Sequence, residues 1–164
     1  IEDANQLTNT LTHIKQKYGD INTIYHLAGV IKDTLFRNKS KDDFTSVIKV
    51  KVLGLESLSK VSPIIRPQSV VCFSSLTGVI GNVGQTDYAA ANAALNRVTQ
   101  LNQQQPHTSW KVVHWGLWDT NDGMTMQPNA SIQPLNTRNA LQMLDDFLQN
   151  QPGDTAAIYQ GDPD

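Results

Sequence analysis

The sequence has few features that would cross-link, charge or anchor the chain. Cys72 is the single cysteine among 164 residues, so no internal disulfide can form and a reducing, cytoplasmic compartment is expected. Charged residues make up 17% of the chain and the formal net charge is −2, which argues against nucleic-acid and anionic membrane partners. No apolar run approaches the roughly 18 residues of a membrane span. A hydrophobic share of 39% then predicts one globular domain over residues 1–164.

Two groups of binding motifs are also missing. No G-x-G-x-x-G and no Walker-type loop occurs, and Gly78, Gly81 and Gly84 are interpreted as shaping a loop rather than a phosphate cradle. The histidines are scattered and form no Cys/His cluster, so no metal site is predicted.

Apolar periodicity predicts alternating helices and strands. Pro63 and Pro67 are expected to end the second helix, and Ser40 with Asp43 resembles a capping box at its start. The alternation predicts a parallel sheet flanked by helices, an α/β Rossmann-like fold. The expected helices cover residues 3–18, 41–61, 86–105 and 137–150, and the expected strands cover residues 21–27, 69–73, 110–117 and 155–159.

The most informative stretch runs from the strand at residues 69–73 into the helix that starts at residue 86. Ser75 follows this buried strand, and Tyr88 lies near the start of the helix. Tyr88 and Asn92 are four residues apart and therefore share one helix face. A hydroxyl at a strand end and a phenol on the next helix can meet at the carboxyl edge of a parallel sheet, where sites of such folds lie.

The spacing of these residues resembles the active site of short-chain dehydrogenases/reductases. Tyr88 follows Ser75 by thirteen residues, but Asn92 stands where most of that family has lysine, and Lys51 lies 24 residues before Ser75. This exchange of the lysine and asparagine positions resembles the pattern in the ketoreductase (KR) domains of modular polyketide synthases. The other matching segments are His26-Leu27-Ala28-Gly29-Val30, Phe73-Ser74-Ser75, Gly84-Gln85, Tyr88-Ala89-Ala90-Ala91-Asn92-Ala93 and Trp115-Gly116-Leu117-Trp118.

The resemblance implies an NADPH-dependent reduction of a β-ketoacyl thioester on an acyl carrier protein. Tyr88 would be the general acid, Ser75 would stabilise the oxyanion, and Lys51 would lower the pKa of the phenol. Asn92 would support the lysine or a water chain. The implied cofactor-binding residues are Ala28, Gly29, Lys51, Tyr88, Trp115 and Gly116.

The resemblance also implies a stereochemical outcome and a lid. Asp33 stands where many ketoreductases that form D-hydroxy products have their last Asp, and Ile80 replaces the Trp typical of L-forming enzymes eight residues before the tyrosine. A D-hydroxy product is therefore expected. Residues 119–134 correspond to the family's substrate lid. The backbone of the loop after His26 would lie along the cofactor.

A complete domain of this family also contains a Gly-rich cofactor-binding portion, which this sequence lacks. The chain is therefore expected to be the C-terminal part of a ketoreductase catalytic domain, with the missing N-terminal part in the same or another chain, and to be inactive alone. A non-catalytic structural module and a stand-alone short-chain dehydrogenase remain alternatives.

Each candidate residue also has a structural interpretation that the sequence leaves open. Tyr88 could be a packing residue of an Ala-rich helix, and Ser75 a cap or turn residue. Lys51 could be a solvated helix charge like Lys49, and Asp33 an exposed loop residue. Cys72, Trp115 and Trp118 could all belong to the core.

Overall fold

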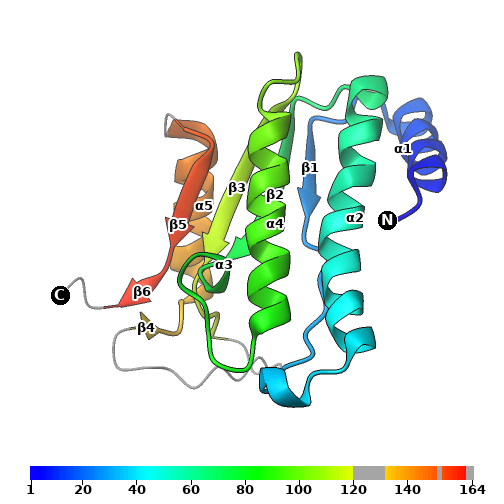
Figure 1. Cartoon of the computed structure of the whole chain (residues 1–164). Coiled ribbons are helices and arrows are strands. Elements are labelled where there is room, and N and C mark those ends of the chain that lie inside the picture. The colour runs from blue at the N-terminus through cyan, green and yellow to red at the C-terminus, as the bar shows by residue number, and fades with distance from the viewer. Residues whose placement is uncertain (120–131, 151–152, 162–164) are drawn as a thin grey trace.

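The computed structural model describes residues 1–119, 132–150 and 153–161. Figure 1 shows one layer of parallel strands with helices in front of and behind it. In chain order the elements are α1 (Ala4–Tyr18), β1 (Thr23–His26), the 3₁₀ turn η1 (Phe36–Asn38), α2 (Lys41–Ile65), β2 (Ser69–Ser75), α3 (Thr77–Ile80), α4 (Thr86–Asn102), β3 (Ser109–Trp115), β4 (Ile132–Gln133), α5 (Thr137–Asn150), β5 (Thr155–Ile158) and β6 (Gln160–Gly161).

The central sheet has four parallel strands in the order β1-β2-β3-β5. Thr23 lies opposite Ser69 at the start of the first pair, and Ser75 lies opposite Trp115 at the end of the second. All four strands therefore end at one edge, at the bottom of Figure 1. The expected Rossmann-like parallel sheet is confirmed. β4 and β6 form a separate antiparallel pair that the sequence did not predict.

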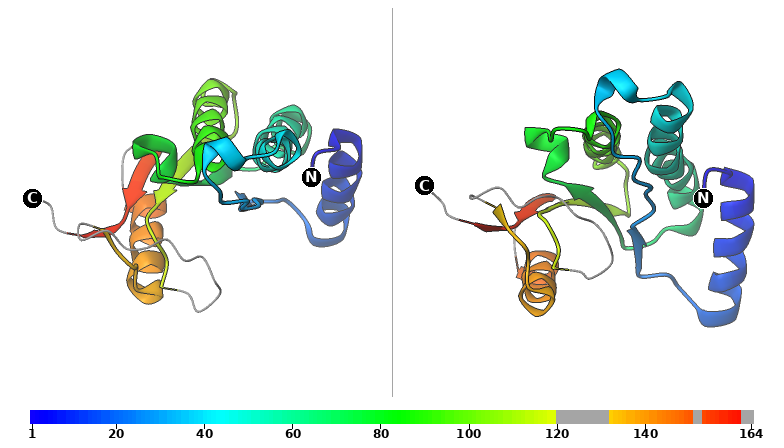
Figure 2. Two further views of the ribbon diagram at one scale, coloured as in Figure 1. Left: turned by 60° about the horizontal axis from the view of Figure 1, so that its bottom comes forward. Right: turned by 90° about the horizontal axis from the view of Figure 1, so that it is seen from below.

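Helices cover the two faces of the sheet unequally. α2 and α4 pack on one face, α1 packs against α2, and α5 lies on the opposite face beside β3 and β5 (Figure 2). Cys72 belongs to the core between the sheet and helices α2 and α4, as expected. Tyr25 and Leu27, on β1 and just after it, are about half exposed. On the face that carries α5, the part of the sheet around β1 is therefore left uncovered.

The predicted end of α2 is wrong, because this helix continues through Pro63 to Ile65. A proline in a helix cannot donate to the carbonyl four residues earlier, which here belongs to Ser59. That carbonyl instead accepts hydrogen bonds from Ser62 Oγ and from Gln105 Nε2, both at 3.3 Å. The helix ends one turn later, where Arg66 adopts a left-handed conformation.

Other boundaries differ from the expectation as well, and β1, α4, β3 and β5 each depart by one to three residues from an expected end. β2 extends two residues beyond Phe73 and so includes Ser75, and the predicted glycine loop begins with the short helix α3. Ser40 caps α2 as expected, since its Oγ accepts from the Asp43 N–H at 3.0 Å. Within the described ranges, none of the helices is both long and apolar enough to cross a membrane.

Candidate active site

The carboxyl edge of the sheet brings most of the predicted site residues together. Ala28 and Gly29 follow β1, Ser75 ends β2, and Gly116 follows β3. Tyr88 lies in the first turn of α4, whose start is at the same edge in Figure 1. Residues from four separate elements therefore converge because parallel strands end side by side.

Ser75 has one local structural role. Its Oγ accepts the N–H of Thr77 at 3.2 Å, which satisfies a backbone donor at the start of α3. A hydroxyl that accepts one hydrogen bond still has its own O–H to donate. The turn role and a role toward a substrate oxygen are therefore compatible.

The Tyr88 phenol keeps its proton at neutral pH. Burial raises the pKa of the phenol, the Asn92 and Ser75 side chains lower it in part, and the Asp33 carboxylate raises it. The Nζ of Lys51 lies 5.9 Å from the centre of the Tyr88 ring. The net shift is upward and Lys51 is not among its causes, so the expectation that Lys51 lowers the pKa of this phenol is wrong for this structure.

Lys51 is a buried cation, in contrast to Lys49 on the same helix, which is exposed. Its residue exposure is only 4%, and its Nζ donates to the Phe73 carbonyl at 3.0 Å. Burial lowers the pKa of Lys51 to about 8, and the Cys72 thiol acts in the opposite direction. The interpretation of Lys51 as a solvated charge is therefore wrong.

Asn92 is fully buried beneath Tyr88. Its Nδ2 donates to the Tyr88 carbonyl at 2.8 Å, while its Oδ1 has no hydrogen-bond partner in the described part of the chain. Gly78 makes this packing possible, because a Cβ on residue 78 would lie 2.7 Å from the Asn92 Cβ. A buried acceptor without a partner is rare in native proteins and fits a site for water or ligand.

The segment after β1 borders Lys51 directly. A Cβ on Gly29 would lie 3.2 Å from Lys51 Cε, so the glycine lets the lysine pass close to the backbone. His26, at the end of β1, is fully buried, and its Nε2 lies 3.2 Å from the Lys51 carbonyl. Burial lowers the pKa of His26 to about 4. His26 therefore joins β1 to α2 as a neutral side chain.

The predicted cofactor residues after β3 have mainly packing contacts. The Trp115 side chain is buried in the core under α5 and packs against Phe73 and Trp118, with ring centres 5.2 and 4.7 Å apart. The Trp115 carbonyl accepts the Leu76 N–H at 2.9 Å. Gly116 approaches Tyr159, since a Cβ there would lie 2.9 Å from the Tyr159 Cβ. The backbone of this turn, rather than the tryptophan ring, lies at the sheet edge.

Asp33 is exposed but not free. Its Oδ2 accepts from Gln85 Nε2 at 2.8 Å, and Gln85 is itself only 4% exposed. The sequence analysis noted Gln85 only as part of a matching segment and gave it no role, and it missed the buried ion pair between Lys39 and Asp87. These contacts join residues about 50 positions apart, for which the sequence carries no local signal. The predicted lid at residues 119–134 lies mostly outside the described residues.

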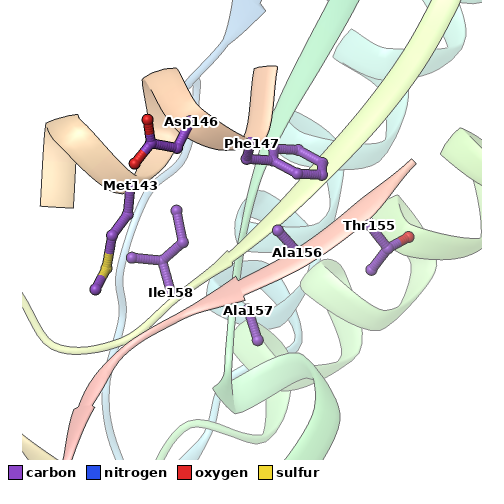
Figure 3. Close-up of a pocket in the computed structure, with 7 residues that line it drawn as sticks. All are labelled: Met143, Asp146, Phe147, Thr155, Ala156, Ala157 and Ile158. Carbon is purple, nitrogen blue, oxygen red and sulfur yellow. The ribbon is translucent and has the colours of Figure 1, made fainter. Parts of the chain in front are cut away.

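A pocket of about 430 Å³ lies between α5 and β5 (Figure 3). Five of its seven lining residues are apolar, Asp146 is the one charged side chain, and none of the seven belongs to the predicted site. Across the described ranges, no three His, Cys, Asp or Glu side chains are grouped to hold a metal ion.

Comparisons with known proteins point to one family. The family profile described as "KR domain" matches residues 1–120. The polyketide synthase PksN of Bacillus subtilis is 34% identical over 164 aligned residues, which cover 91% of this chain and 3% of that protein. The 3-oxoacyl-acyl-carrier-protein reductase FabG of Thermotoga maritima is 33% identical over 104 residues, 61% of this chain and 42% of that protein.

Solved structures show the same fold. An N-terminal ketoreductase from the macrolactin assembly line superposes with a TM-score of 0.86 at 28% identity, covering 98% of this chain and 32% of that one. A ketoreductase domain from the bacillaene assembly line gives a TM-score of 0.83 at 26% identity, with 99% and 42% covered. The chain thus spans less than half the length of each of these proteins.

Proposed function

Because the chain belongs to the KR domain family, we propose that it takes part in reducing a β-ketoacyl thioester, held on an acyl carrier protein, to the β-hydroxyacyl thioester during polyketide synthesis. The buried ammonium of Lys51, 5.9 Å from the Tyr88 ring, carries this proposal. Lys51 has no carboxylate partner among the described residues, and burying such a lysine is costly. A catalytic use of the charge explains the arrangement. The names of the matched reductases support the same reaction class.

In the proposed mechanism the chain supplies the proton and stabilises the developing negative charge. Tyr88 donates its phenolic proton to the carbonyl oxygen, and the Ser75 hydroxyl donates a hydrogen bond to the same oxygen. The Lys51 ammonium stabilises the phenolate that remains. The buried Oδ1 of Asn92 would accept a hydrogen bond from a water that returns the proton to Tyr88.

We propose NADPH as the reductant, and it would supply the hydride when bound. Lys51 fits the nicotinamide-ribose part, because an ammonium has three donors and the described structure shows one acceptor for it, the Phe73 carbonyl. The open backbone at Ala28 and Gly29 and the turn at Trp115 and Gly116 would border the cofactor. The 164 residues contain no Gly-rich phosphate loop, so the phosphates would be held by another portion of the domain.

The chain would therefore act as the C-terminal portion of a ketoreductase catalytic domain. Its partners would be the polypeptide segment that completes the cofactor site and the acyl carrier protein with its substrate. Asp33, held by Gln85 near Tyr88, supports the expectation of a D-hydroxy product.

Substitution of Tyr88 by Phe in the complete ketoreductase domain tests the proposal. The phenol hydroxyl is the proposed proton source, so turnover of a model β-keto thioester should fall about a hundredfold or more. NADPH consumption measures the rate, and Tyr18→Phe on the exposed surface of α1 is the matched control. Retained turnover in Tyr88→Phe would remove the role given to this residue. A wild-type domain without turnover would favour a non-catalytic module.

A further inference from the structure

A buried ion pair connects the segment after β1 to the start of α4. Lys39 Nζ and Asp87 Oδ2 lie 2.8 Å apart, and the two side chains are 2% and 0% exposed. The other ion pairs of the described chain are solvated, with side-chain exposures of 38% and 83% for Lys15–Asp20 and of 54% and 44% for Lys32–Asp43. Solvated ion pairs contribute little to stability. The Lys39–Asp87 pair, in contrast, joins two segments in the interior, out of contact with solvent.

One end of the pair reaches the backbone of Tyr88. The second carboxylate oxygen of Asp87, Oδ1, accepts the Tyr88 N–H at 3.0 Å. This N–H lies in the first turn of α4, where backbone donors have no helical partner, and the residue before the helix, Gln85, provides no side-chain cap. Asp87 therefore fixes the first turn of α4 at the residue that bears the proposed proton donor.

The other end of the pair reaches the backbone next to Asp33. Lys39 Nζ also donates to the carbonyl of Lys32, the residue before Asp33. Two parallel contacts join the same segments: Gln85 Nε2 donates to Asp33 Oδ2 at 2.8 Å, and Thr34 N–H donates to the Gly84 carbonyl at 2.9 Å. The Lys39–Asp87 pair is the member of this set in which both partners are charged and both side chains are buried.

We propose that Lys39 and Asp87 are positioning residues that hold Tyr88 and Asp33 at a fixed separation and thereby control which face of the ketone is reduced. This inference rests on the proposed reductase function. A proton donor displaced by about 1 Å can lose a hundredfold in rate. A looser Asp33 segment would also let the substrate carbonyl present both faces to the site. Buried ion pairs are often replaceable without loss of stability, so rate and stereochemistry are the properties to measure.

The double variant Lys39→Met/Asp87→Asn tests the pair in the complete domain. It removes both charges together, and the amide introduced in place of the Asp87 carboxylate retains an oxygen for the Tyr88 N–H. We expect kcat to fall about tenfold or more and the minor alcohol to rise about tenfold. Hydrogen exchange should also become faster in both residues 31–39 and residues 84–90. Chiral chromatography of the product and exchange mass spectrometry measure these effects, and the exposed pair variant Lys15→Met/Asp20→Asn is the matched control.

The outcomes separate the inference from the proposed function. If the wild-type domain does not reduce the β-keto thioester, the proposed function fails. If the wild type is active and the folded double variant keeps its kcat, product ratio and exchange pattern, the pair only stabilises the fold and the inference is wrong.

Lys39→Arg provides a second test should the double variant not fold. A guanidinium is bulkier than an ammonium and holds its donors in a rigid planar fork, so the Lys32 and Asp87 contacts should shift and the minor alcohol should rise about threefold or more. Lys15→Arg is its control. An unchanged product ratio in Lys39→Arg would equally overturn the inference.

Discussion

At the residue scale, Lys51 costs stability in exchange for a charge at the site. Its folded-state pKa of about 8 lies below its ordinary value of 10.5, so the folded state disfavours the charged form. Below about pH 8 both states carry the proton and the full cost applies, about 3 kcal/mol from this difference. Between about pH 8 and 10.5 the folded state loses its proton first, so stability rises with pH in this window.

We therefore predict that Lys51→Met stabilises the complete domain by ~1–3 kcal/mol at neutral pH while lowering turnover about a hundredfold or more. The wild-type gain in stability above about pH 8 should be absent from the variant. Denaturant unfolding over this pH range and NADPH consumption measure the two effects. Lys49→Met, at an exposed position of the same helix, is the control. A destabilised Lys51→Met would contradict the view of a costly buried charge.

His26 should make the protein sensitive to acid. Its pKa is lowered from 6.5 to about 4, so the buried side chain is held neutral. Above about pH 6.5 His26 is neutral in both the folded and the unfolded state, and its full contribution to the free energy of unfolding is present. As the pH falls toward 4 the unfolded state takes up the proton first, and about 3 kcal/mol of this free energy is lost. His26→Gln should flatten this part of the stability profile, measured by denaturant unfolding between about pH 7 and 4.5. Exposed His13→Gln should leave the profile unchanged; equal profiles for wild type and His26→Gln would refute the assignment.

At the scale of elements, the contact between α3 and α4 depends on the missing side chain of Gly78. A Cβ there would lie 2.7 Å from the Asn92 Cβ and 3.1 Å from the Ala93 nitrogen, both on α4. We predict that Gly78→Ala costs about 1–3 kcal/mol and also lowers turnover, because Asn92 must move. Thermal unfolding and steady-state rates check this prediction. Val79→Ala, on the exposed side of α3, should change neither; an unaffected Gly78→Ala would show that α3 shifts at no cost.

The end of α2 shows how one element depends on another. Local rules place a helix end before Pro63, yet Gln105, just beyond α4, supplies the hydrogen bond that the proline cannot give. Boundaries set by local chemistry were predicted well, such as the Ser40 cap and the range of α5. Boundaries that depend on a partner distant in the sequence, such as the end of α2, were predicted incorrectly, because no local pattern encodes them.

At the scale of the whole molecule, the sheet is covered on one face by α2 and α4 but only partly by α5 on the other (Figure 2). Among the described strands β1 pairs only with β2, and Tyr25 on β1 is 48% exposed. In the proposed function this open side and edge would face the portion that completes the cofactor site.

The 164-residue chain alone should accordingly bind NADPH only weakly. It has the proposed nicotinamide-side residues but no Gly-rich loop for the phosphates, which supply much of the affinity in such sites. We expect no saturation in the micromolar range when NADPH fluorescence is titrated with the isolated chain, and clear saturation with the complete domain. Micromolar binding by the isolated chain would contradict this division of the cofactor site.

The sequence by itself determined the alternation of helices and strands, and hence the parallel sheet, because apolar periodicity and caps are local properties. It also indicated that Ser75 and Tyr88 could meet, because a strand end and the start of the following helix lie at the same edge of a parallel sheet. Only the tertiary structure decided that Lys51 is buried and that Lys39 and Asp87 pair in the interior. Burial and ion pairing depend on which distant segments pack together, and a charged residue has the same local pattern whether it is solvated or enclosed.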